Sequence, residues 1–282
     1  MSRNQNRAFG NNPEVTPPSV EAQPPPIPPP TQQAPASAFN FIVPTEMIDL
    51  PSKGEFYLEG HPLCGVDSIE IKHMTAKEED ILTSSTLLKK GIALDKMLQS
   101  IIVDKRIKVG DLLIGDKNAL LIASRIFGYG AAYTVRALCP KCESEFATTV
   151  DLAELKSKVL TAVQAVKITP VNTFVVTLPQ SNFAIEFRLL TSKDESAMSG
   201  NKSGGTMKLL KLITVSVNEQ TDRIYIERAL QSLPIIDTSI LKKTYAAVMP
   251  DVDMRQDIEC GECGEISEMG VPLNADFFWP DL

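Results

Sequence analysis

Two Cys-x-x-Cys pairs, Cys139/Cys142 and Cys260/Cys263, constrain this chain more than any other feature of its sequence. Apolar and polar residues alternate on both sides of each pair, which favours a strand, a tight turn and a second strand. Such a turn brings two sulfurs within reach of one metal, and Zn²⁺ takes four thiolates in a tetrahedron. The two pairs together therefore predict one structural zinc ion per chain, held by all four cysteines.

Other interpretations of the cysteines are weaker. A redox Cys-x-x-Cys normally opens a helix after a strand, which lowers the pKa of the thiol, whereas both pairs here are flanked by predicted strands. Hairpins that have lost their metal remain an alternative. A catalytic zinc usually has His or carboxylate ligands and an open position. The two histidines, His61 and His73, fit ordinary surface or structural positions better. Cys64 is expected to be a small buried or half-buried apolar residue.

The sequence also contains an internal similarity. Residues 69–80 and 185–196 match in charge and apolar character nearly position by position, at an offset of 185 − 69 = 116. The cysteine pairs are offset by 260 − 139 = 121, and Asp116 matches Asp237 at the same offset. The matches follow the same order and their offsets differ by loop-sized insertions. We therefore interpret the chain as a duplication.

Each predicted half contains the same elements. A short strand leads into a Leu-Pro turn (Leu50-Pro51 or Leu178-Pro179), and an alternating strand follows. A Thr-x-x-Glu or Thr-x-x-Asp sequence then opens a helix. Helices are expected at about 76–88, 95–104 and 116–127, and at about 193–199, 206–216, 223–232 and 238–247. We predict an α+β fold of two similar halves, 39–160 and 161–282, each ending in a Cys-x-x-Cys hairpin and joined at one zinc site.

Residues 1–38 differ from the rest in composition. Ten prolines fall between Pro13 and Pro35, and this segment lacks the apolar residues needed for a core, so we predict a disordered, stiff tail. The N-terminus lacks the apolar stretch of a signal peptide, and no run of about 18 apolar residues occurs. These features predict a cytoplasmic protein that makes no membrane contact.

Composition and motifs argue against several functions. The net charge is −7, whereas nucleic-acid binders usually present a basic face. The acidic residues of 251–268 fit a solvated surface better than a patch for a basic partner. The sequence contains no P-loop, no Gly-x-Ser-x-Gly and no His-Glu-x-x-His. We therefore predict a non-enzymatic protein without a small-molecule substrate and without a nucleic-acid partner.

The chain ends on an aromatic cluster, Phe277-Phe278-Trp279-Pro280. Such a cluster either folds back onto the core or anchors a partner protein. Folding back is the simpler expectation.

Several strings resemble a known family. They are Leu-Pro-Ser-Lys-Gly-Glu-Phe-Tyr at 50–57, Met-Thr-Ala-Lys-Glu-Glu-Asp-Ile-Leu-Thr at 74–83, Leu-Leu-Lys-Lys-Gly at 87–91, the Cys-Pro-x-Cys hairpin and the terminal aromatic cluster. Over roughly residues 45–282 the chain resembles the baseplate hub assembly proteins of T-even-type bacteriophages with contractile tails. The proline-rich tail is not part of that resemblance.

The resemblance implies a non-enzymatic protein that helps to build the central hub of a phage baseplate. It implies action in the cytoplasm of the infected host, and it leaves open a place in the finished virion. The implied partners are other hub or tail-tube proteins, with an oligomer within the baseplate as a further option. Two alternatives from other classes stay open, a zinc-ribbon regulator that contacts nucleic acid or RNA polymerase and a dithiol oxidoreductase.

Overall fold

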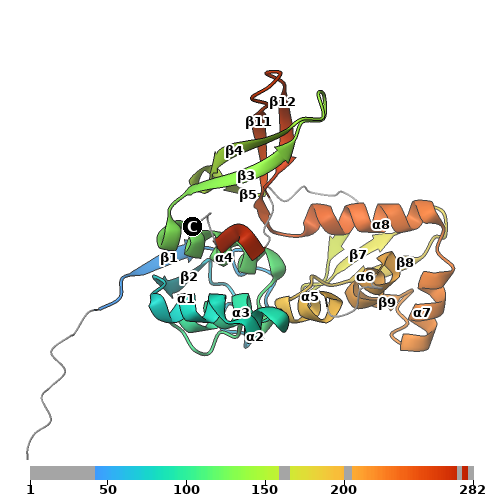
Figure 1. The fold of residues 1–282 in the computed structure, drawn as a ribbon. Coiled ribbons are helices and arrows are strands. Elements are labelled where there is room, and N and C mark those ends of the chain that lie inside the picture. The colour runs from blue at the N-terminus through green and yellow to red at the C-terminus, as the bar shows by residue number, and fades with distance from the viewer. Residues whose placement is uncertain (1–41, 159–165, 200–204, 272–274, 279–282) are drawn as a thin grey trace, which may run out of the picture. The chain divides into compact units, whose positions relative to one another are not determined.

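The computed structural model describes residues 42–158, 166–199, 205–271 and 275–278. The described helices and strands belong to one compact unit, Val43–Leu282 (Figure 1). No helix within these ranges is both long and apolar enough to cross a bilayer. The predicted tail at 1–38 lies outside the described residues. Below, "N-terminal half" means the described residues up to 158, and "C-terminal half" means those from 166 onward.

The N-terminal half begins with two strands, continues through helices and ends in a hairpin. Its elements are β1 (Thr45–Asp49), β2 (Ser68–Lys72), α1 (Ala76–Thr83), α2 (Ser85–Lys89), α3 (Ala93–Ile101), the 3-10 turn η1 (Val109–Asp111), α4 (Ile114–Tyr129), β3 (Ala132–Leu138), β4 (Glu145–Asp151), the 3-10 turn η2 (Leu152–Glu154) and β5 (Lys156–Ser157). Strands β1 and β2 pair antiparallel, with Ile48 opposite Ile69. The predicted cap opens α1, because the Thr75 N–H donates to Glu78 Oε2 at 3.0 Å.

The C-terminal half follows a similar order. Its elements are β6 (Val166–Ile168), β7 (Phe174–Thr177), β8 (Ala184–Phe187), α5 (Ser192–Ser199), α6 (Thr206–Ile213), β9 (Thr214–Val217), α7 (Arg223–Gln231), α8 (Ile235–Val248), β10 (Val252–Asp253), β11 (Arg255–Glu259), β12 (Ile266–Gly270) and the 3-10 turn η3 (Ala275–Phe278). Strands β6 to β9 form an antiparallel sheet in sequential order. The helix expected to run to 216 ends at Ile213, because the β-branched Thr214, Val215 and Val217 continue as strand β9.

The mixed order of helices and strands confirms the predicted α+β class. The helix boundaries agree with the expected ones to within a few residues, except that the helix expected at 76–88 is divided into α1 and α2. Ser84 lies between them with φ −64° and ψ 107°, which interrupts the helical backbone.

A buried aspartate occupies the third position of the last long helix in each half. In α4, Asp116 accepts hydrogen bonds from the Ser52 N–H at 3.0 Å and the Tyr57 hydroxyl at 2.7 Å. In α8, Asp237 accepts from the backbone N–H groups of Gln180 at 3.1 Å and Ser181 at 2.7 Å. Each aspartate thus holds the turn that follows a Leu-Pro pair, which ties the end of a strand to the start of a helix. The sequence shows only that the two aspartates match at the offset of 121.

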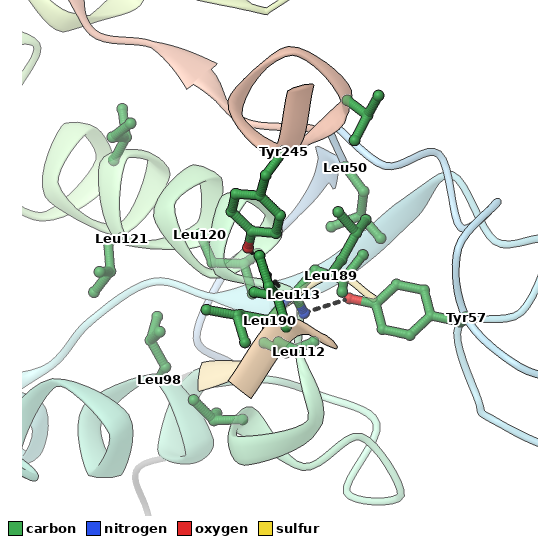
Figure 2. Close-up of a cluster of buried hydrophobic side chains, with 14 of the residues drawn as sticks. Leu50, Tyr57, Leu98, Leu112, Leu113, Leu120, Leu121, Leu189, Leu190 and Tyr245 are labelled. Carbon is green, nitrogen blue, oxygen red and sulfur yellow. Dashed lines mark hydrogen bonds between the residues drawn. The ribbon is translucent and has the colours of Figure 1, made fainter. Parts of the chain in front are cut away.

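The halves meet at a junction of leucines (Figure 2). Leu112 and Leu113, just before α4, lie beside Leu189 and Leu190, which follow β8, and all four are buried. The Leu113 N–H donates to the hydroxyl of Tyr57 at 3.0 Å, which supports the junction from the side of the N-terminal half.

Helix α4 extends this junction along its first two turns. Lys117 is buried and its ammonium lies 2.8 Å from Asp95 of α3 and 3.0 Å from Glu195 of α5. Gly115 faces the segment after α8, where an added Cβ would lie 1.9 Å from the Pro250 carbonyl oxygen. A side chain at this position would therefore push the two halves apart.

Candidate metal centre

The two cysteine hairpins have the same backbone geometry. In the first, β3 and β4 pair up to Leu138 opposite Glu145, and in the second β11 and β12 pair from Glu259 opposite Ile266. Each first cysteine donates its N–H across the turn, Cys139 to Ser144 O at 3.0 Å and Cys260 to Glu265 O at 2.8 Å. Strands on both sides of each pair agree with the sequence prediction.

The turns close in the same way. The Glu143 N–H donates to Cys139 O at 3.0 Å, and the Gly264 N–H donates to Cys260 O at 2.9 Å. Both donors lie in the left-handed region, with φ of 55° at Glu143 and 68° at Gly264. Glycine adopts this conformation without strain, whereas glutamate does so at a cost in free energy. The sequence of the second turn is therefore better suited to the fold than that of the first.

The four sulfurs of the two hairpins converge on one point. The Sγ atoms of Cys139, Cys142, Cys260 and Cys263 all lie within 4.8 Å of one another. Two of the distances between hairpins are 3.7 Å, from Cys139 to Cys263, and 3.8 Å, from Cys142 to Cys260. A Zn–S bond of about 2.3 Å places the sulfurs of a regular tetrahedron about 3.8 Å apart. The spacing of the thiols therefore fits a tetrahedral four-thiolate site.

Access to the cluster differs between the two cysteines of each pair. Cys139 and Cys260, which close the strands, are buried, whereas Cys142 and Cys263 are exposed at the tips of the hairpins. Across the hairpins, the exposed Lys141 forms an ion pair with Glu265 at 2.7 Å. An exposed pair of this kind adds little stability, but it links the two turns beside the sulfurs.

The thiols of the cluster do not share one pKa, because their surroundings differ. Hydrogen bonds from the side chain and backbone of Ser144 lower the pKa of Cys142 to about 6. Burial acts against ionisation of Cys260, but backbone N–H groups of the turn outweigh it and lower the pKa of that thiol. At Cys263 a backbone hydrogen bond from Glu265 acts to lower the pKa, but partial desolvation of the sulfur and the neighbouring sulfurs raise it to about 12. Metal binding to such a set releases the remaining protons.

The residues considered as other ligands lie elsewhere. Within the described ranges, the four cysteines are the one group of three or more His, Cys, Asp or Glu residues close enough to share a metal. His61 stacks on Tyr57 with ring centroids 4.5 Å apart, and His73 stacks on Phe127 at 5.1 Å. Cys64 is exposed, so the expectation that it is buried or half-buried was wrong. It occupies a turn whose Leu63 takes the core position instead.

The C-terminal aromatics fold back onto the core as far as they are described. Phe277 and Phe278 are both buried, and the Phe277 ring packs edge-on against Tyr133 of β3 at 5.1 Å. The buried guanidinium of Arg125 donates from Nε to the Phe277 carbonyl oxygen at 2.9 Å. Trp279 and Pro280 lie outside the described residues. Arg125 carried no sequence signal, since an arginine in a helix is usually solvated.

Comparison with known proteins gives one match. A family model described as T4 bacteriophage base plate protein matches residues 44–279. No curated protein and no solved structure matches the chain. The matched range begins just before β1 and ends at the aromatic cluster, so it includes both hairpins and the leucine junction. The chain therefore belongs to the family of T4 bacteriophage base plate proteins.

Proposed function

We propose that the chain is a non-enzymatic structural protein of the central hub of a contractile-tail baseplate, stiffened by one zinc ion. The observation that carries the proposal is the sulfur cluster. Two hairpins that are 260 − 139 = 121 residues apart present four thiols at tetrahedral spacing in a member of a baseplate family. A rigid scaffold of this kind suits a protein whose work is to contact other structural proteins.

Zinc is the metal that the ligand set favours. Four thiolates in a tetrahedron suit a closed structural Zn²⁺ site, and no position is left for a substrate or water. All four ligands, Cys139, Cys142, Cys260 and Cys263, come from the turns of the two hairpins. The binding free energy of the metal then contributes directly to the order of both hairpins.

The zinc proposal is tested by removing one ligand. Cys260→Ser should lose stoichiometric zinc and be strongly destabilised, because three thiolates leave the site open. Cys64→Ser is the matched control, since Cys64 is exposed and lies outside the cluster. Zinc per chain is measured by elemental analysis and stability by thermal unfolding. A Cys260→Ser protein with one zinc per chain and unchanged stability would contradict the assignment.

We also propose that the chain arose by duplication, with halves at 39–160 and 161–282. Several features support this. A Leu-Pro turn, a capped helix, a helix with a buried aspartate and a cysteine hairpin follow one another in the same order in both. An experimental structure is the test: the halves should superpose over these elements. Failure of these four elements to superpose would contradict the proposal.

The hub role predicts specific partners in infected cells. We expect the tagged protein to recover other hub proteins or tail-tube proteins in stoichiometric amounts. Recovery of no tail protein would contradict the role. The protein should be found in the host cytoplasm during assembly, and detection in purified particles decides whether it remains in the virion. Salt-dependent DNA binding would favour the zinc-ribbon regulator instead, and disulfide reductase activity dependent on Cys139 would favour the oxidoreductase.

A further inference from the structure

Two neighbouring isoleucines at the start of α8 are exposed. Ile235 has 89% of its surface accessible and Ile236 has 56%. At the offset of 121 found for the cysteine pairs, these residues correspond to Ile114 and Gly115 at the start of α4. Ile114 is half-buried and Gly115 is buried, because the C-terminal half covers them. The same helix start is therefore covered in one half and uncovered in the other.

A short backbone pairing covers the start of α4. The Ile114 N–H donates to Leu190 O at 3.3 Å, and the Ser192 N–H donates to Leu112 O at 2.8 Å. Between these hydrogen bonds, Leu113 lies in an antiparallel bridge with the C-terminal half. Figure 2 shows Leu112 and Leu113 close to Leu190. This contact has two different sides, the segment before α4 and the segment before α5.

The first side recurs before α8 in a conformation ready to pair. The offset of 121 takes Leu112–Ile114 to Leu233–Ile235. The central residues have nearly the same backbone, with φ −61° and ψ 147° at Leu113 and φ −57° and ψ 149° at Pro234. Proline has no N–H, but the pairing does not need one there, because the Leu113 N–H donates to Tyr57 instead.

The second side recurs before α1 and is also uncovered. The offset of 116 takes Leu190–Ser192 to Met74–Ala76. Leu190 and Ser192 are buried, whereas Met74 is half-buried and Ala76 is exposed. Within the described ranges, neither the Met74 carbonyl nor the Ala76 N–H makes a hydrogen bond in the chain. At the offset of 116 they correspond to the Leu190 carbonyl, which accepts in the internal pairing, and to the Ser192 N–H, which donates in it.

We propose that residues Leu233–Ile236 of one copy dock on residues Met74–Ala76 of a second copy. The contact repeats between chains the pairing that joins the two halves within a chain. The Ile235 N–H of one copy donates to Met74 O of the other, and the Ala76 N–H of that copy donates to Leu233 O. This inference rests on the proposed duplication. Because the two surfaces differ, the contact is head-to-tail and continues into a ring or a filament.

The receiving surface has apolar side chains for the isoleucines. Phe127 is 38% exposed and stacks on His73, next to Met74. The new contact differs from the internal one in one respect. Gly115 lets the Pro250 carbonyl approach its helix closely, whereas Ile236 carries a side chain. The second copy therefore sits farther from α8 at this point, and the isoleucine fills the added space.

Each side can be blocked without disturbing the fold. Ala76→Pro removes only the donor N–H, because Ala76 is the first residue of α1, where proline is tolerated. The extended Thr75, with φ −124° and ψ 176°, suits the position before a proline. Ile235→Asp places a carboxylate in the first turn of α8, where the helix dipole stabilises it. Either change should weaken self-association about tenfold or more.

Two controls match these variants. Ser85→Pro puts proline at the first position of the neighbouring helix α2, after an extended Ser84. Ile224→Asp places a carboxylate in the first turn of α7, at an isoleucine that is 64% exposed. Both controls should self-associate like the wild type. Molar mass is measured by analytical ultracentrifugation of the full, zinc-loaded chain over a concentration series.

Mixing the two blocked variants tests the direction of the contact. At concentrations where the wild type has just begun to associate, each variant alone should remain monomeric, because each lacks one side. Together they should form a dimer and nothing larger, since the intact side of one meets the intact side of the other. A two-fold contact between identical surfaces would not give this result. A mixture that stays monomeric, or an Ala76→Pro protein that self-associates as tightly as the wild type, would overturn the inference.

Failure of this inference differs from failure of the proposed function. A wild-type chain that is monomeric throughout the series overturns the head-to-tail contact, whether or not it recovers hub proteins from infected cells. A chain that self-associates as described but recovers no tail protein overturns the hub role instead.

Discussion

Replacement of Asp116 gives the sharpest test of how the N-terminal half is held together. The carboxylate is fully buried and accepts three hydrogen bonds, from the Ser52 N–H at 3.0 Å, the Ser52 hydroxyl at 2.6 Å and the Tyr57 hydroxyl at 2.7 Å. In Asp116→Ala all three donors lose their acceptor in a site that water cannot easily reach. At about 1–3 kcal/mol for each unsatisfied buried group, partly offset by rotation of the hydroxyls, the loss should be about 3–5 kcal/mol.

The isosteric change Asp116→Asn should be much milder, about 1–2 kcal/mol. The amide oxygen can still accept from the Ser52 N–H, and the amide N–H₂ can face two hydroxyls that are able to turn and accept. Urea unfolding of the two variants and the wild type measures both losses. Equal losses in the two variants, or an Asp116→Ala protein within about 1 kcal/mol of wild type, would refute this account of the site.

The dependence on pH has a definite sign. Burial raises the pKa of Asp116, although hydrogen bonds from Ser52 and Tyr57 oppose it. A carboxyl group whose folded-state pKa is raised favours folding most when it is protonated. Stability is therefore lost as the pH rises from the unfolded pKa through the folded one. The variant Asp116→Asn has no titrating group at this position. The difference in the free energy of unfolding between the wild type and this variant should therefore narrow as the pH rises through that window.

Other contacts give further predictions. Gly115→Ala should cost about 1–3 kcal/mol through overpacking, whereas Gly110→Ala, whose Cβ meets its nearest neighbour at 3.8 Å, should be nearly neutral in the same urea series. Arg125→Ala should lower the free energy of unfolding by about 3–5 kcal/mol, because the guanidinium donates to three carbonyl oxygens. Limited proteolysis of this variant should then release the C-terminal segment. Burial opposes ionisation of Asp194, but the Arg188 guanidinium outweighs it and lowers the pKa to about 2. The wild type should therefore be more stable to unfolding than Asp194→Asn by about 1 kcal/mol, after allowance for solvent screening. This difference should persist above about pH 4 and vanish as the pH falls to about 2. A difference that grows in acid would contradict this.

The cysteine hairpins could be predicted because their signal is local. Two thiols two residues apart, with alternating residues on either side, define a turn and its metal-binding capacity without knowledge of the fold. The same is true of the capped start of α1, where Thr75 and Glu78 interact within one turn of helix. What the sequence could not supply directly was that both hairpins meet. The inference that the hairpins meet relied on the internal similarity. The duplication that this similarity indicates stays a prediction.

The missed features are those that depend on distant contacts. The sequence predicts the end of a helix where strand β9 lies, because the register of β9 with β8 is set by residues about 30 positions away. Asp116 and Arg125 were not recognised as buried, since the same residue types on most helices face solvent. Their partners, Ser52 and Phe277, are 64 and 152 residues distant. Burial of a polar residue is decided by whether such partners are present, and a local pattern does not contain that information.

The leucine junction and the cysteine hairpins join the halves in different ways, and this difference supports the proposal of a metal at the hairpins. The leucine junction is buried, and apolar burial and paired backbone groups stabilise it together. The hairpins bury few side chains: Tyr133, Val135 and Val150 in β3 and β4, and Ile258 alone in β11 and β12. Thin hairpins of this kind are marginally stable by themselves. A zinc ion at their tips would hold the two hairpins to each other and add its binding free energy to their stability.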